Sequence, residues 1–157
     1  MKPILVWYFA SANKRLGHND GRKIVLGRTH RVEGIIIPCQ NGLHGSKRLI
    51  DALQYNSGPV VYRVKLSGTV IPHGTPEDKF AASERTYLAG GFDASEIFWK
   101  AARKFALDVV HLWAAPSVVI KFLKTGDEKL RDAAWAAAWA AIGDAAGDAA
   151  GDAAGDA

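Results

Sequence analysis

The sequence predicts an α+β fold: a small mixed or antiparallel N-terminal sheet with one intervening helix, followed by a helical C-terminal half and an Ala-rich extension. In the first half, apolar residues come in short runs or alternate with polar ones, as in β-strands. From residue 93 onward they recur at helical spacing, and strands that precede helices are typical of α+β proteins. We expect a basic α+β domain over residues 1–126 and an Ala-rich helical extension with GDAA repeats over residues 127–157.

Four segments of the first half bear on the sheet. Residues 4–9 are six consecutive apolar residues, ILVWYF, which are too few for a helix and favour a buried strand. Residues 21–42 contain two short β-rich pieces separated by glycine and proline. Residues 60–71 alternate between a basic face and an apolar face, which is the clearest strand pattern in the chain. Residues 80–89, FAASERTYLA, fit either a strand or a helix.

The intervening helix is predicted from Ser46, which can cap its N-terminus, to a point near Tyr55. A second helix is predicted from Asp93, because Asp93 and Glu96 have the spacing of a capping box and an apolar stripe follows them. Further helices are expected after Pro116 and from residue 127, with Gly126 as the stop between them, because proline suits a first helical turn and glycine a C-terminal cap.

The C-terminal end repeats the four residues GDAA. Alanine favours helix, but each glycine costs about 1 kcal/mol, so helicity of this segment in isolation is marginal. Trp135 and Trp139 precede the repeats and are four residues apart, so they should lie together on a helix. We expect them either to pack on the body of the protein or to form a surface for self-association.

Charge divides the chain into a basic body and an acidic tail. Residues 1–65 contain eleven Lys or Arg and three acidic residues, whereas the chain after Arg131 has no Lys or Arg and five Asp. A basic surface can attract an acidic partner, namely nucleic acid, a nucleotide phosphate or an acidic protein; the alternative is a solvated loop. The candidate ligand-binding residues are Arg22, Lys23, Arg28 and Arg31.

Compartment follows from three features of the sequence. The single cysteine, Cys39, excludes an internal disulfide and fits a reducing cytoplasm. The N-terminal apolar run is rich in aromatic and β-branched residues, so we interpret it as a strand rather than a signal peptide. No segment has the roughly 18 uninterrupted apolar residues of a membrane span. We therefore expect a cytoplasmic protein with no membrane partner.

His44 is the most distinctive candidate for a functional residue, because glycines flank it at positions 42 and 45 and allow close approach of a ligand. With Ser46 at a helix N-terminus beside it, the imidazole could contact a phosphate or a base. The alternative is a histidine hydrogen-bonded to a neighbouring loop. The spacing of the histidines and Cys39 predicts no metal site, and Cys39 itself is expected to be a buried apolar residue rather than a nucleophile.

The stretch GLHGS, followed by DALQY and PVVYRVKLSG, resembles the ADP-ribosyltransferase fold over about residues 4–70. This resemblance implies an enzyme that acts on NAD and uses His44, Glu84 and Tyr55 as catalytic residues. The chain departs from that family at two places. Residues 7–10 read WYFA where the family has His or Arg followed by Gly, and His44 stands where an aromatic ring would stack on nicotinamide.

A second resemblance extends over nearly the whole chain. The segments GLHGS, DALQY, VVYRVKLSG, EDKFAASERTYL and ALDVVHLW, with the Ala-rich tail, are similar to a family of uncharacterised phage and bacterial domains. It implies a phage-type accessory protein in the host cell cytoplasm. Our leading hypothesis is a cofactor-free protein that binds a nucleic acid, a nucleotide or a host protein near His44. An NAD-dependent, ADP-ribosyltransferase-like enzyme is the alternative.

Overall fold

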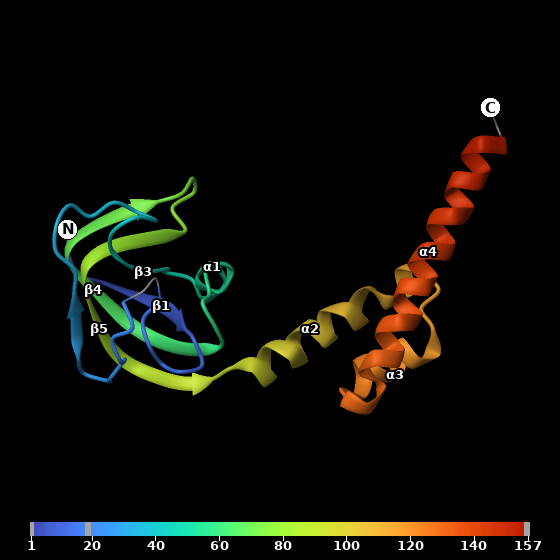
Figure 1. Cartoon of the computed structure of the whole chain (residues 1–157), viewed down its shortest axis with the longest axis horizontal. Helices are drawn as coiled ribbons and strands as arrows, with labels where there is room; N and C mark the ends of the chain where they lie inside the picture. The colour runs from blue at the N-terminus through green and yellow to red at the C-terminus, as the bar shows by residue number, and fades with distance from the viewer. Residues whose placement is uncertain (1, 18–19, 156–157) are drawn as a thin grey trace. The chain divides into compact units, whose positions relative to one another are not determined.

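The computed structural model describes residues 2–17 and 20–155, with side chains up to Asp144. The chain divides into two compact units, residues 1–95 and 96–157 (Figure 1). The boundary that we predicted at residue 126 lies inside the second unit. Residues 96–126 therefore group with the Ala-rich extension and not with the sheet.

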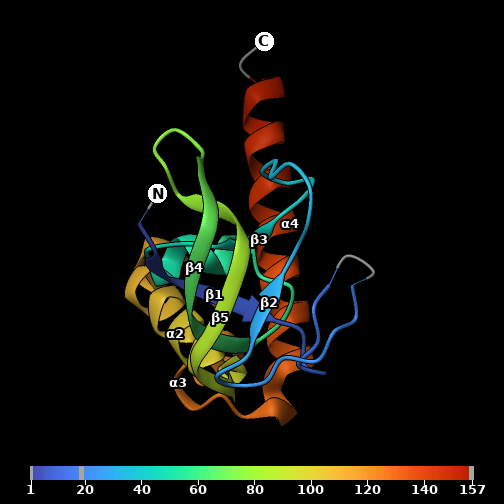
Figure 2. The same cartoon turned by 90° about the vertical axis from the view of Figure 1, so that its left-hand side faces the viewer.

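The first unit is built on an antiparallel sheet, as part of the predicted α+β architecture. Its strands are β1 (Ile4–Ala10), β2 (Thr29–Arg31), β3 (Leu43–Gly45), β4 (Val60–His73) and β5 (Lys79–Asp93). Along the sheet the order is β1-β4-β5-β2, and β3 also pairs with β5 (Figure 2). The long hairpin of β4 and β5 is thus the centre of the unit, and the short strands extend it on both sides.

Alternation along β4 agrees with the sequence pattern. Val64 and Leu66 are buried, whereas Arg63 and Lys65 on the other face are partly exposed. Residues 80–89, which fitted a strand or a helix, lie within strand β5. That segment pairs with β4 along one edge and with β2 and β3 along the other, so pairing with distant residues decides its conformation.

Helix α1 (Leu49–Gln54) begins later than predicted. Its N-cap is Arg48, and no side chain caps it, so the prediction that Ser46 caps this helix is wrong. Ser46 is 1% exposed, and its backbone exchanges two hydrogen bonds with Trp7 of β1. The reason is that strand-like pairing with β1 continues to Ser46 and keeps it extended.

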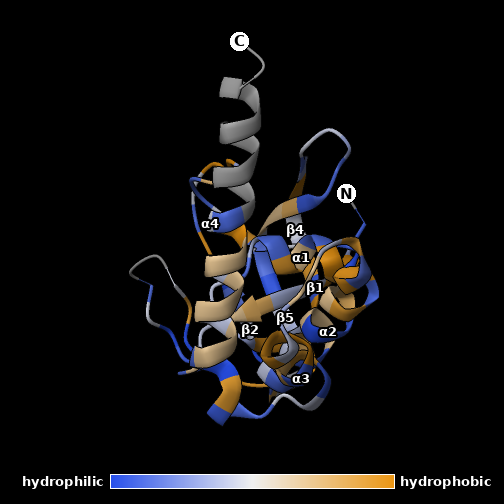
Figure 3. Ribbon diagram, turned by 90° about the vertical axis from the view of Figure 1, so that its right-hand side faces the viewer, coloured by the Kyte–Doolittle hydropathy of each residue, from blue (hydrophilic) through white to orange (hydrophobic). Residues whose placement is uncertain are grey.

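The second unit is helical and contains α2 (Ser95–Val109), α3 (Ser117–Thr125) and α4 (Arg131–Gly155). The Asp93 carboxylate accepts a hydrogen bond from the Ser95 N–H where α2 begins, and Gly126 ends α3 with φ at +67°. Helix α3 packs against α4 and buries Val119, and apolar residues recur along α3 (Figure 3). Among the described residues, no helix is both long and apolar enough to cross a membrane.

Candidate functional site

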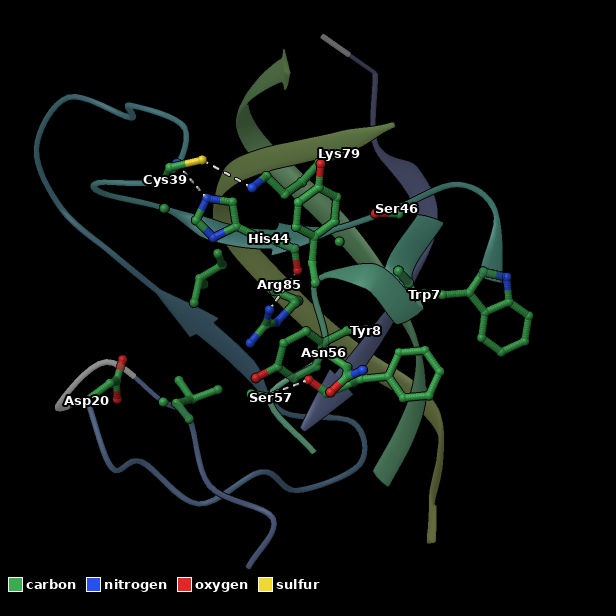
Figure 4. Close-up of a pocket in the computed structure, with 18 of the residues that line it drawn as sticks. Trp7, Tyr8, Asp20, Cys39, His44, Ser46, Asn56, Ser57, Lys79 and Arg85 are labelled. Atoms are coloured by element: carbon green, nitrogen blue, oxygen red, sulfur yellow. Dashed lines mark hydrogen bonds between the residues drawn. The ribbon is translucent and has the colours of Figure 1, made fainter. Parts of the chain in front are cut away.

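A pocket of about 610 Å³ lies in the first unit. Strand β1, the segment around β3, the end of α1 and the start of β5 all contribute to its wall (Figure 4). Of the residues selected from the sequence, His44, Ser46 and Tyr55 line this pocket. The remaining selected residues are not among the lining residues: Arg22, Lys23, Arg28, Arg31 and Glu84.

Arg85 is the most unusual residue of the pocket, because its side chain is charged and only 2% exposed. Its Nε and one terminal nitrogen donate to the Tyr87 hydroxyl at 3.0 and 2.7 Å, and the other terminal nitrogen donates to the His44 carbonyl at 2.7 Å. A guanidinium has five N–H groups, so two of them have no acceptor among the described residues. No described carboxylate forms an ion pair with Arg85.

The partners of Arg85 are neutral. Its guanidinium carbon lies 3.6 Å from the ring centre of Tyr8 and 5.2 Å from that of Tyr87. Burial raises the pKa of Tyr87 to about 12, although Arg85 opposes this shift, so the phenol keeps its proton near neutral pH. The rings and the phenol stabilise the cation by cation–π contact and hydrogen bonds but supply no negative charge.

Alternation along β5 separates Arg85 from Glu84. Successive residues of a strand face opposite sides of the sheet, and here Glu84 accepts hydrogen bonds from Arg31 and Ser67 at 2.9 Å each. The hydrogen bond from Arg31, followed by that from Ser67, lowers the Glu84 pKa. The ADP-ribosyltransferase hypothesis required Glu84 to lie close to His44 and Tyr55. In the structure, Glu84 lies apart from them, because it is not among the residues that line their pocket.

His44 connects the pocket to the neighbouring loop. Its Nε2 accepts a hydrogen bond from the Cys39 backbone N–H at 3.2 Å, and its carbonyl accepts the bond from Arg85. Of the two interpretations of His44, the structure shows the hydrogen bond to the loop. Cys39 is exposed rather than buried, which corrects our expectation of a buried apolar residue.

Lys79 is a second buried cation in the pocket. It is 8% exposed, and its ammonium lies 4.0 Å from the ring centre of Tyr55. The Tyr55 hydroxyl donates to Asp78 at 2.8 Å, and this hydrogen bond is the main reason that the Tyr55 pKa is raised. Sequence reasoning missed both Lys79 and Arg85. A strand assignment for residues 80–89 would have placed Arg85 on the same face as the aromatic Tyr87. That shared face was the sequence feature that could have indicated a buried Arg85.

The basic residues that we selected from the sequence do not form a free positive patch. Arg22 pairs with Asp20 at 2.6 Å, and Arg31 pairs with Glu84 at 2.9 Å. The hydrogen bond to Asp20 raises the Arg22 pKa. Lys23 and Arg28 are exposed and make no ion pair with the described residues. Half of the selected cations are therefore already neutralised by a carboxylate.

No protein family, no curated protein and no solved structure matches the chain. The two family resemblances noted in the sequence therefore stay predictions. Among the described residues, no three His, Cys, Asp or Glu side chains gather closely enough to hold a metal ion.

Proposed function

We propose that the first unit binds a small phosphorylated ligand, of mononucleotide size, in the pocket above Arg85. One observation carries this proposal: Arg85 is 2% exposed and has no carboxylate partner in the described chain. A buried charge without a counter-charge is expensive, and a bound anion would remove that cost. The phosphate group suits the site because its oxygens match the planar fork of donors on arginine.

A nucleotide fits this site better than the other two predicted partners. The pocket volume of about 610 Å³ falls within the range of small-molecule sites, roughly 300 to 1,000 Å³. Arg85 is too deeply buried for the surface of a duplex or a protein to reach. Because Arg85 lines the pocket, a small phosphate group at the end of a ligand would approach it from there. Tyr55 is 44% exposed and presents a ring on which a base could stack. A cytoplasmic, phage-type accessory role, as the sequence suggests, is compatible with such a ligand.

Calorimetric titration of the full chain tests the proposal. The ligands are inorganic phosphate, AMP, ADP, NAD and a single-stranded oligonucleotide. The variant is Arg85→Met, and its matched control is Arg28→Met, which removes an exposed cation that is not among the residues lining the pocket. We expect a mononucleotide to bind the natural chain and the control equally, and Arg85→Met to bind at least about tenfold more weakly, because charge-assisted hydrogen bonds are lost.

Three results would contradict the proposal. Equal affinity of folded Arg85→Met and the natural chain would show that Arg85 is not the anion site. Binding of the oligonucleotide alone would favour nucleic acid as the partner. Release of nicotinamide from NAD would instead support the ADP-ribosyltransferase alternative, with a catalytic group other than Glu84. Thermal melting of each variant shows whether the fold is kept.

A further inference from the structure

Cys39 lies against two basic side chains in the same unit. Its sulfur is 3.1 Å from the Lys79 Nζ and 3.7 Å from the His73 Nε2. The thiol is exposed, and Cys39 lines the pocket together with Lys79 (Figure 4). Nucleophilic cysteines require this combination, namely access to solvent and a positive or basic neighbour.

The fold holds these groups together from three parts of the sequence. His73 and Lys79 are directly opposite each other where β4 and β5 meet at the end of their hairpin. Cys39 belongs to the turn of residues 37–41, which closes with hydrogen bonds between Ile37 and Asn41. The Cys39 backbone has φ at +67°, which is uncommon for a residue with a side chain, and its N–H donates to His44. The turn is thus fixed by hydrogen bonds with the thiol facing Lys79.

Charge gives the second reason to regard Cys39 as a reactive group. Lys79 is 8% exposed, makes no ion pair with the described residues and has the Cys39 sulfur as its hydrogen-bond partner. It also lies over the neutral ring of Tyr55. The Lys79 ammonium thus lies within hydrogen-bond distance of the sulfur, and the thiolate is the nucleophilic form of cysteine.

We propose that Cys39 is a nucleophile that takes the acyl group of a small acyl compound with an anionic leaving group, of the acyl phosphate class. The choice of leaving group rests on the proposed function, because Arg85 would bind the phosphate. His44 connects the two residues: its ring accepts a hydrogen bond from the backbone N–H of Cys39, and its backbone carbonyl accepts one from Arg85. Cys39 and Arg85 line the same pocket, so a substrate with an acyl carbon next to a phosphate would present one group to each.

The first step is a substitution at the acyl carbon. The Cys39 thiolate attacks this carbon, a C–S bond forms, and the C–O bond to the phosphate breaks. Phosphate leaves with the electron pair of that bond, and the acyl group remains on the sulfur as a thioester. Lys79 acts as a positioning cation that stabilises the thiolate before the attack.

The second step returns the free thiol. Water attacks the thioester carbon, and His73, whose Nε2 lies 3.7 Å from the sulfur, takes a proton from that water. The C–S bond breaks and the sulfur leaves as the thiolate beside Lys79, which stabilises its charge. The products are a carboxylic acid and the original Cys39, so the overall reaction is hydrolysis of the acyl phosphate.

Acetyl phosphate is the test compound, with the intact mass of the full chain as the readout. Cys39 is the single cysteine of the sequence, so any thioester, recognised by its cleavage with hydroxylamine at neutral pH, forms there. We expect a thioester-bound acetyl group on part of the natural chain during turnover and none on Cys39→Ser. Lys79→Met should slow the labelling by roughly tenfold or more, because the opposite charge beside the sulfur is lost. The control Lys47→Met removes an exposed lysine that contacts a different ring, that of Phe80, and should label normally.

Two further comparisons separate the nucleophile from the anion site. His73→Gln should accumulate the thioester. This variant lacks the base for hydrolysis of the thioester, whereas Cys39 and Lys79, which serve the attack on the acyl carbon, are kept. Alkylation with neutral iodoacetamide, which displaces iodide and needs no phosphate site, should be faster in the folded natural chain than in the urea-unfolded chain and unchanged in Arg85→Met. If Arg85→Met alkylates normally but loses its labelling by acetyl phosphate, both proposals are supported.

The two proposals fail in different ways. One contrary result is iodoacetamide alkylation that is no faster in the folded chain than in the unfolded chain and is unaffected by Lys79→Met. This result would overturn the proposal that Cys39 is a nucleophile, but it would not affect the proposal of nucleotide binding. Acetylation confined to lysines, which hydroxylamine does not reverse, would do the same. Fast alkylation with no nucleotide binding would overturn the proposed function but keep Cys39 as a reactive residue. Its substrate would then be a neutral acyl donor, which contradicts the phosphate leaving group that we propose.

Discussion

Arg85 of β5 stacks on Tyr8 of β1, with 3.6 Å between the guanidinium carbon and the ring centre. These strands are not neighbours in the sheet, because β4 lies between them. The stacking therefore reaches across β4 and joins the floor of the pocket to the core of the unit. Tyr8 also meets Tyr87 edge to face, with 6.3 Å between the ring centres. One aromatic side chain thus contributes to both the stability of the sheet and the position of the cation.

Replacing Tyr8 should affect folding and binding together. We expect Tyr8→Leu to lower the free energy of unfolding by about 1 kcal/mol or more, because the cation–π contact and an aromatic pair are lost. It should also weaken nucleotide binding, since Arg85 loses its support. Tyr8→Phe keeps the ring and is the control. Urea unfolding and calorimetry measure the two effects, and equal stability of the Leu and Phe variants would refute the role of the ring.

His30 should make the protein less stable in mild acid. The ring is buried, packs edge to face on Tyr87, and has no hydrogen-bond partner on either nitrogen among the described residues. Burial, and then the positive charges of Arg22 and Arg85, lower the His30 pKa below its usual value of 6.5. As pH falls below about 6.5, the unfolded chain takes up this proton before the folded chain does, so stability is lost.

Urea unfolding at about pH 7.5 and about pH 5.5 tests this expectation, since carboxylates titrate mainly below that range. The natural chain should lose more stability between the two values than His30→Phe, which keeps an aromatic ring of similar size but cannot take up a proton. Identical losses in the two proteins would show that His30 does not contribute to the acid sensitivity.

Gly45 should tolerate no side chain. A Cβ at this position would overlap the Val6 side chain and lie 3.1 Å from the Trp7 carbonyl oxygen, because β3 packs closely against β1. We expect Gly45→Ala to lower the free energy of unfolding by roughly 1 to 3 kcal/mol through overpacking. Gly17→Ala is the control, since a Cβ there meets nothing within 4 Å. If both variants unfold at the same urea concentration, the close packing of β3 on β1 is not significant for stability.

Trp135 and Trp139 should mediate self-association. Their ring centres are 5.9 Å apart, and the side chains are 66% and 57% exposed. Exposed aromatic pairs are typical anchors of protein interfaces. We expect sedimentation to show a larger species for the natural chain and for a chain lacking residues 143–157. The double variant Trp135→Ser, Trp139→Ser should be monomeric. A natural chain that sediments as a monomer would contradict this prediction.

Local patterns were sufficient for much of the fold. Strand β4 and the helix stop at Gly126 follow from alternation and from backbone preference, which are properties of neighbouring residues. The pairing of Ser46 with Trp7 could not be foreseen in this way, because the partner is far away in the sequence. The same is true of β5, whose apolar spacing suits two conformations until β2, β3 and β4 pair with it.

In the candidate site, too, some features follow from neighbouring residues and others only from tertiary contacts. The sequence by itself determined that glycines stand close to His44 on both sides, because that depends on adjacent residues. The strand around His44 was not predicted, because it forms by pairing with the distant residues 80–82 of β5. Only the tertiary structure decided that Arg85 and Lys79 are buried. Charged residues are expected at the surface. Here groups from distant segments hold two of them inside: Tyr8 stacks on Arg85, and the Cys39 sulfur accepts a hydrogen bond from Lys79. Such contacts are absent until the chain has folded, so the charges that define the pocket could not be recognised from their neighbours in the sequence.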